Sequence, residues 1–234
     1  MQSTDPAATD LVLSSGFLAF SRHIGFLDAV EDAVGAGRFR VGAICGTSSG
    51  AMTGALWSAG WPARRIADEL TARSPLRWMR FSPTPWRGLF LMDGVIEHLR
   101  RLLPRNIEDL PRPFAVGVVR PDGTPGLLTE GPLAEAVAAS CAMPVVFAKV
   151  ALPGGPHSDG GAKDRLGLEA FRALRGPRPT LVHLVRRSAG PESGPLPDDV
   201  RVVHSERSRA TFFSLGDLHG QAEVSRAATQ AVLG

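Results

Sequence analysis

The sequence has few cysteines, few lysines and no long apolar run. Cys45 and Cys141 are the only cysteines in 234 residues, which excludes a disulfide-stapled scaffold. No apolar run reaches the ~18–20 residues that a membrane-spanning helix needs. The residues after Met1 also lack the basic and apolar regions of a signal peptide. We therefore expect a cytoplasmic protein whose only contact with a membrane is peripheral.

The basic residues are almost all arginine, because Lys149 and Lys163 are the only lysines among 26 basic side chains. The arginines are scattered along the chain, whereas a nucleic-acid interface would gather them on one face. We therefore expect no nucleic-acid partner. Apolar residues make up 44% of the chain and charged residues 21%, which is typical of a globular protein and excludes a disordered one.

Short apolar runs alternate with segments of helical spacing, and this order predicts a parallel sheet covered by helices. Strands are expected at 11–15, 38–45, 114–119, 145–152, 181–185 and 201–204, and helices at 23–34, 51–59, 62–72, 94–103, 132–141, 168–174 and 215–233. Residues 1–10 read as a flexible tail, and 190–199 as a loop. We predict one three-layer α/β/α domain over 11–234, with a mainly parallel central sheet.

The segment Gly46-Thr-Ser-Ser-Gly50 fits the pattern G-x-S-x-G and lies between a predicted strand and a predicted helix. In that context the central serine occupies a strained turn, and the flanking glycines, Gly46 and Gly50, avoid a clash between strand and helix. The Ser48 hydroxyl would project above the sheet as a nucleophile. The N–H group of Ser49 would point toward a developing oxyanion at the helix N-terminus.

A serine nucleophile needs a base. By chain order His204 or His219 could serve, whereas His23 and His98 are expected to be structural or surface residues. Asp159 is the stronger candidate, since Gly160 and Gly161 directly after it let the backbone follow a tight path. Taken alone, these residues favour the alternative of an ordinary Asp-Gly turn. No histidine or cysteine spacing indicates a metal site, and no cofactor is expected.

Several segments together resemble the patatin-like phospholipases, in unbroken order over about residues 11–175. The resemblance is carried by Leu11–Ser14, His23–Leu27, Gly46–Leu56, Glu130–Phe147 and Asp159–Gly161. It implies a patatin-like fold and a serine acyl hydrolase whose Ser48–Asp159 dyad works without histidine. It also implies a lipid or small ester as substrate, with transient contact with a membrane surface. It predicts no oligomeric state.

The loop after the first strand departs from that family, in which it is glycine-rich, carries a basic residue and supplies oxyanion N–H groups. Here Gly16 is kept, but Phe17 stands where a glycine is usual and Ala19 replaces the basic residue. Phe20 replaces another glycine. The resemblance assigns the oxyanion hole to Gly16, Phe17 and Ser49, with Arg22 as a candidate replacement cation.

Two further hypotheses follow from these features. The altered loop favours a patatin-shaped pseudoenzyme that binds acyl chains or a protein partner without turnover. The histidines late in the chain leave open an esterase that depends on His204 or His219. Residues 74–93, which include Trp78, Phe81 and Trp86, resemble the family's variable cap and suit a lipid headgroup boundary. The alternative is that this apolar segment packs on the core. Cys45 and Cys141 are expected to be packing residues.

Overall fold

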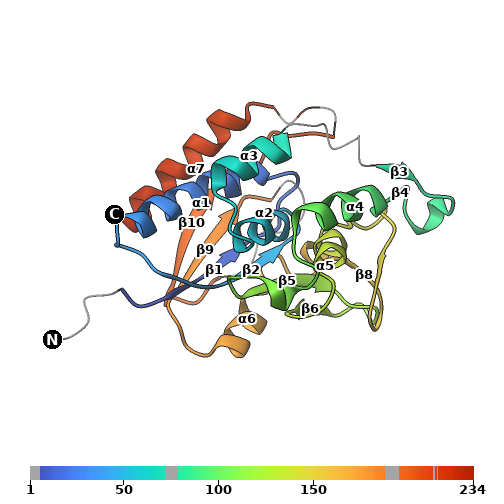
Figure 1. The fold of residues 1–234 in the computed structure, drawn as a ribbon, viewed down its shortest axis with the longest axis horizontal. Helices are drawn as coiled ribbons and strands as arrows, with labels where there is room; N and C mark the ends of the chain where they lie inside the picture. The colour runs from blue at the N-terminus through green and yellow to red at the C-terminus, as the bar shows by residue number, and fades with distance from the viewer. Residues whose placement is uncertain (1–5, 72–78, 188–194, 213, 215) are drawn as a thin grey trace.

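The computed structural model describes residues 6–71, 79–187, 195–212, 214 and 216–234. The strands of the main sheet are β1 (Thr9–Leu13), β2 (Val41–Thr47), β5 (Phe114–Val119), β6 (Pro125–Leu128), β7 (Val150–Leu152), β8 (Gly155–Asp159), β9 (Thr180–Val185) and β10 (Val200–Ser205). Among the described residues they form an eight-stranded sheet in the order β10-β9-β1-β2-β5-β8-β7, with β6 also paired to β5 (Figure 1).

The helices are α1 (Phe20–Gly35), α2 (Ser49–Ser58), α3 (Ala63–Thr71), α4 (Asp93–Leu102), α5 (Leu133–Ser140), α6 (Leu168–Arg175) and α7 (Leu218–Leu233). Side chains of β1 alternate between the two faces of the sheet. Leu11 and Leu13 join the core under the larger helical layer, whereas Val12 packs with Phe171 of α6 on the opposite face. The result is an α/β fold with helices on both sides of the sheet (Figure 1).

The sheet is mostly parallel, as the sequence predicted. β10, β9, β1, β2 and β5 run parallel, whereas β6 and β8 pair antiparallel with β5. The register places Thr47 opposite Gly117, and Val118 opposite Asp159. The end of β2 and the end of β8 therefore lie at the same edge of the sheet, with β5 between them.

Most predicted elements are present, and the main differences lie in the strands. The strand expected over 145–152 is wrong for its first part, since only Val150–Leu152 is extended and Val145 has a φ of 73°. β6 and β8 were not predicted, because they are short and polar or glycine-containing. The predicted flexible tail over 1–10 is wrong for its last two residues, since β1 begins at Thr9. The buried Asp10 there accepts a hydrogen bond from the Ala43 N–H and pairs with Arg175 at 3.0 Å.

Some predicted features fall on residues that the structure does not describe. Trp78 and the start of the 74–93 segment lie outside the described residues, as do 190–194 of the predicted loop and Leu215. Within the part of the chain that is described, no helix combines the length and apolarity needed to cross a bilayer.

Helices α1 and α7 pack closely where α1 carries a glycine. A Cβ atom on Gly25 would overlap the carbonyl group of Ala222 in α7. Nearby, a buried Arg22 side chain donates a hydrogen bond to the carbonyl oxygen of Gln221 at 3.0 Å. The absence of a side chain at Gly25 therefore sets how close the two helices lie.

We expect Gly25→Ala to lower the free energy of unfolding by about 1–3 kcal/mol, because the added methyl group must push the helices apart. Gly35→Ala is the matched control in the same helix, since a Cβ atom there meets nothing within 4 Å. The control should be neutral or stabilising, as alanine is the better helix former. Urea unfolding measures both, and equal stability of the two variants would contradict the close contact.

Candidate active site

Ser48 lies in the turn that joins β2 to α2, where its φ and ψ are 54° and −118°. Non-glycine residues rarely adopt such a conformation, which costs about 1–3 kcal/mol and persists only when the surroundings enforce it. Two glycines make the turn fit. A Cβ atom on Gly46 would overlap the backbone of Gly50, and one on Gly50 would overlap the carbonyl group of Leu13. The strand-turn-helix context predicted for the G-x-S-x-G pattern is therefore confirmed.

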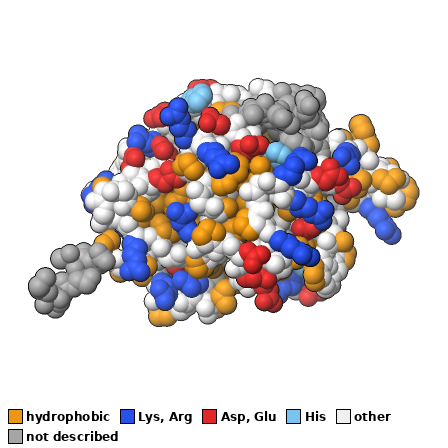
Figure 2. All heavy atoms as spheres, viewed as in Figure 1, with side chains coloured by type: hydrophobic (Ala, Val, Ile, Leu, Met, Phe, Trp, Pro, Cys, Tyr) orange, Lys and Arg blue, Asp and Glu red, His pale blue; other side chains and the backbone are white. Residues whose placement is uncertain are grey.

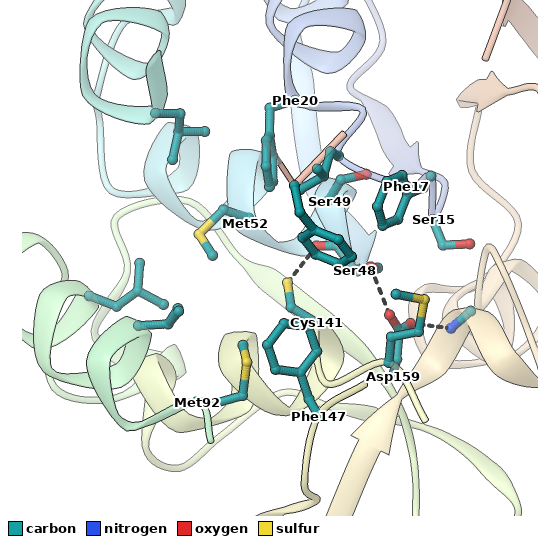
Figure 3. A pocket seen from close by; sticks show the side chains of 18 of the residues that line it. Ser15, Phe17, Phe20, Ser48, Ser49, Met52, Met92, Cys141, Phe147 and Asp159 are labelled. Carbon is teal, nitrogen blue, oxygen red and sulfur yellow. Dashed lines mark hydrogen bonds between the residues drawn. The ribbon is translucent and has the colours of Figure 1, made fainter. Parts of the chain in front are cut away.

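The Ser48 hydroxyl donates a hydrogen bond to Asp159 Oδ2 at 2.9 Å (Figure 3). Asp159 ends β8, and its Oδ1 accepts a hydrogen bond from the Gly161 N–H at 2.7 Å. A Cβ atom on Gly160 would lie 2.6 Å from the carbonyl oxygen of Gly117, and one on Gly161 would lie 2.6 Å from Ser15. The two glycines thus let the Asp159 turn press against neighbouring loops.

Burial raises the pKa of Asp159 from its ordinary value of 3.8 to about 6. Removal from water disfavours the charged carboxylate, and this effect outweighs the opposing hydrogen bonds from Gly161 and Ser48 and the positive charge of Arg187. The carboxylate is therefore a stronger base than an exposed aspartate.

Ser140, at the end of α5, joins the Ser48 turn to β5 through two hydrogen bonds. Its hydroxyl accepts a hydrogen bond from the Ser48 N–H at 2.8 Å and donates one to the carbonyl oxygen of Gly117 at 2.6 Å. Sequence analysis did not assign Ser140 a role, although it lies inside the Glu130–Phe147 segment that carries the family resemblance. Cys141 follows it and places its thiol 3.3 Å from the Ser48 carbonyl oxygen. Burial raises the pKa of that thiol and of Cys45, so both stay protonated.

The loop after β1 lies beside the Ser48 turn (Figure 3). Among the described residues, the N–H groups of Gly16, Phe17 and Ser49 have no hydrogen-bond acceptor. The strained residue of the loop is Leu18, with a φ of 46°, and Phe17 avoids positive φ. The phenylalanine at a position where glycine is usual is therefore accommodated, and its ring packs edge-on against Phe212 with centroids 5.0 Å apart.

Among the described residues, the Arg165 side chain contacts this loop, whereas the Arg22 side chain points to α7. The Arg165 guanidinium donates hydrogen bonds to the carbonyl oxygens of Ser15 and Val185 and lines the cavity above Ser48. Arg22 instead faces α7 and does not line that cavity. The suggestion that Arg22 replaces the family's basic residue is therefore wrong.

A cavity of about 580 Å³ opens over Ser48 and Asp159. Its walls are mainly apolar side chains from four helices, namely Phe20, Met52, Leu56, Leu70, Val95 and Leu99. Figure 3 shows Met52, Met92 and Phe147 around the same space. The contribution of α3 and α4 could not be predicted, because their local residue pattern does not indicate that they cover the Ser48 turn.

The histidines predicted as candidates do not accept the hydrogen bond of the Ser48 hydroxyl, which goes to Asp159 in the described part of the chain; His98 pairs with Glu69 and His23 with His183. Neither His204 nor His219 lines the cavity, and both are exposed. His98 was expected at the surface, but it lines the cavity and pairs with Glu69 at 2.9 Å. His23 is fully buried against His183, with their Nδ1 atoms 2.9 Å apart, and burial lowers its pKa to about 3. Within the described residues no cluster of three or more His, Cys, Asp or Glu side chains could hold a metal ion.

Comparison with solved structures identifies a shared fold. VipD from Legionella pneumophila superposes with a TM-score of 0.61 at 13% sequence identity, covering 97% of this chain and 67% of VipD. ExoU, in its complex with SpcU from Pseudomonas aeruginosa, gives a TM-score of 0.51 at 18% identity, covering 97% of this chain and 51% of ExoU.

Sequence comparison identifies curated relatives. The uncharacterized NTE family proteins Rv1063c of Mycobacterium tuberculosis and Mb1092c of Mycobacterium bovis are each 30% identical to this chain over 190 residues. The matched region covers 77% of this chain and 50% of each relative, so the chain spans about half the length of these relatives. A family model described as patatin-like phospholipase matches residues 11–172, which include both the Ser48 turn and the end of β8. The chain therefore belongs to the patatin-like phospholipase family.

Proposed function

We propose that this protein is a serine acyl hydrolase that cleaves ester bonds of lipids, with Ser48 as nucleophile and Asp159 as its base. The observation that carries the proposal is the 2.9 Å hydrogen bond between these side chains at the floor of a mainly apolar cavity. Membership of the patatin-like phospholipase family supports lipid esters as the substrate class. No metal or cofactor takes part in the proposed mechanism.

In the first step the Ser48 oxygen attacks the ester carbonyl carbon while its proton passes to Asp159. The carbonyl oxygen gains the negative charge, and the N–H groups of Gly16, Phe17 and Ser49 are the proposed donors that stabilise it. The bond to the alcohol then breaks, and the proton on Asp159 moves to the departing oxygen. An acyl group remains on Ser48.

In the second step a water molecule attacks this acyl group while Asp159 accepts one of its protons. When the tetrahedral intermediate collapses, the proton returns to the Ser48 oxygen and a carboxylic acid is released. A carboxylate can serve as base in both steps because burial has raised its pKa toward neutrality, where general bases are most effective.

The acyl chain would lie along α2. Met52 and Leu56 follow Ser48 by four and eight residues and line the same cavity. At 1.5 Å per residue, eight residues of helix extend about 12 Å from the nucleophile. The cavity therefore offers an apolar channel to the acyl side of the ester.

We expect Ser48→Ala to abolish hydrolysis of p-nitrophenyl butyrate and labelling by a fluorophosphonate probe. Asp159→Asn should lower kcat by about 10²–10⁴-fold, because it removes the general base. His204→Ala and His219→Ala are the controls and should leave the rate unchanged. Full activity in Ser48→Ala would overturn the proposal, and loss in either histidine variant would favour the histidine-dependent esterase. An unlabelled wild-type Ser48 would favour the acyl-binding pseudoenzyme.

We expect kcat/KM to fall about tenfold per pH unit below about 6 and to level off above it, because Asp159 must be ionised to act as base. Stability should show the opposite trend. Since the folded-state pKa is raised above the unfolded value, ionising Asp159 destabilises the fold as pH rises from 3.8 to about 6. The wild type should therefore lose stability relative to Asp159→Asn across that window. A rate plateau extending to pH 4 would contradict this assignment.

We expect kcat/KM to rise with acyl length from acetyl to octanoyl esters, by at most about fourfold per methylene, since each buried methylene contributes ~0.8 kcal/mol. Val95→Trp should replace a small side chain of α4 with an indole ring that fills part of the cavity. It should therefore remove the increase in kcat/KM for octanoyl esters. Its rate with the acetyl ester is the internal control and should be unchanged. A chain-length profile identical to the wild type would exclude this channel.

A further inference from the structure

The segment between α3 and α4 exposes large apolar side chains on a short hairpin. Its strands are β3 (Arg80–Phe81) and β4 (Phe90–Leu91), joined through the 3₁₀ turn η2 (Pro85–Arg87), and the hairpin projects beyond α4 (Figure 1). Phe81 is 83% exposed and Trp86 79% exposed. Leu89 and the neighbouring Val145, which is 80% exposed, complete what we call the hairpin surface.

This surface gathers four of the seven exposed large hydrophobic residues in the described part of the chain. The other three, Val34, Leu174 and Val224, lie on three different helices. Figure 2 shows apolar side chains at the end of the molecule where the hairpin projects. Scattered apolar side chains are normal on a protein surface, whereas a gathered group marks an interaction site.

The hairpin is held in place by the loop that lines the cavity. The N–H groups of Leu89 and Phe90 donate hydrogen bonds to the carbonyl oxygens of Val145 and Val146, at 3.2 and 2.9 Å. Gly88, with a φ of 137°, permits this contact, because a Cβ atom there would overlap the backbone of the loop. Val145 is a β-branched residue at positive φ, a strained conformation that keeps its side chain in solvent.

A line of aromatic rings connects the hairpin surface to the cavity. The centroids of Phe81 and Phe90 lie 5.1 Å apart, and those of Phe90 and Phe147 lie 6.3 Å apart. Phe147 lines the cavity above Ser48 (Figure 3). A row of aromatic side chains therefore links the solvent-facing hairpin to the wall of the cavity above Ser48.

The charged residues of the hairpin itself are all basic. Arg80 and Arg87 are the only charged residues between 79 and 92, and Lys149 is exposed just after the Val145 loop. Arg80 pairs with Glu97 on α4 at 3.1 Å, and Asp93 at the start of α4 is also exposed. Arg87 follows the exposed Trp86 directly and Lys149 follows the exposed Val145 by four residues. Basic groups close in sequence to exposed apolar side chains suit an interface with anionic headgroups.

We propose that the hairpin surface docks the protein on a lipid bilayer that contains anionic headgroups. Phe81 and Trp86 enter the interfacial region, Arg87 and Lys149 contact headgroup phosphates, and a lipid reaches the cavity past Phe90 and Phe147. A projecting hairpin with a group of exposed large side chains fits a deformable lipid interface better than the flat or concave face of a protein partner. Hydrolysis of a lipid that enters the cavity rests on the proposed function, whereas docking on the bilayer can be measured without hydrolysis.

The test uses the full chain carrying Ser48→Ala, to prevent hydrolysis, and vesicles of phosphatidylcholine with or without phosphatidylserine. We expect the protein to co-sediment with the anionic vesicles. The pair Phe81→Ser and Trp86→Ser should lower the affinity for these vesicles at least about tenfold, because two large apolar side chains no longer enter the interface. The matched control is the pair Leu174→Ser and Val224→Ser, which removes exposed apolar side chains elsewhere and should bind normally. Arg87→Glu with Lys149→Glu should weaken binding to anionic vesicles and reduce its salt dependence.

A second measurement separates docking from folding and from catalysis. In the otherwise wild-type chain, the Phe81→Ser and Trp86→Ser pair should keep its kcat/KM for soluble p-nitrophenyl butyrate while hydrolysis of vesicle lipid falls at least about tenfold. Vesicle binding unaffected by this pair overturns the docking proposal, as does an equal loss on the soluble ester. Self-association of the wild-type chain through the hairpin, without binding to vesicles, also overturns the docking proposal. Vesicle docking by a chain without esterase activity would uphold this inference and refute the proposed function.

Discussion

The site depends on how closely backbone segments approach one another around Ser48. Gly46, Gly50, Gly160 and Gly161 each lie where a Cβ atom would meet a neighbouring strand, turn or loop. Their lack of side chains lets the β2–α2 turn, the end of β8 and the loop after β1 converge within a few ångströms. The strained backbone of Ser48 is one consequence, because the packing that surrounds the turn leaves it no relaxed alternative.

The same convergence sets the chemistry of Asp159. A carboxylate pressed between loops beneath an apolar cavity loses most of its hydration, so its pKa rises even though it accepts two hydrogen bonds. In the proposed function, apolar burial supplies the basicity for which serine hydrolases with a Ser-His-Asp triad use a histidine. The cavity therefore has two roles in the proposed function, since it receives the acyl chain and also makes the base effective.

The cavity also connects the proposed catalysis to the proposed docking. Its wall includes Phe147, from a loop whose outer residue Val145 is held in an exposed, strained conformation. That loop supports the hairpin through backbone hydrogen bonds, so its position affects both the cavity and the hairpin surface.

The local pattern of residues was enough to predict the alternating strands and helices and the Ser48 turn, whereas the role predicted for the aspartate before Gly160 and Gly161 came from the family resemblance. Apolar periodicity and glycine spacing are local properties, so they can be recognised in the sequence without a structure. Short polar strands such as β8 left no such signal, and neither did Ser140 or Arg165, whose partners lie far along the chain. The 2.9 Å contact between Ser48 and Asp159 spans 111 positions, and the cavity is assembled from helices that only the folded chain brings over the site. Those features depend on strand register and helix packing, which are set by the whole core rather than by any segment of it.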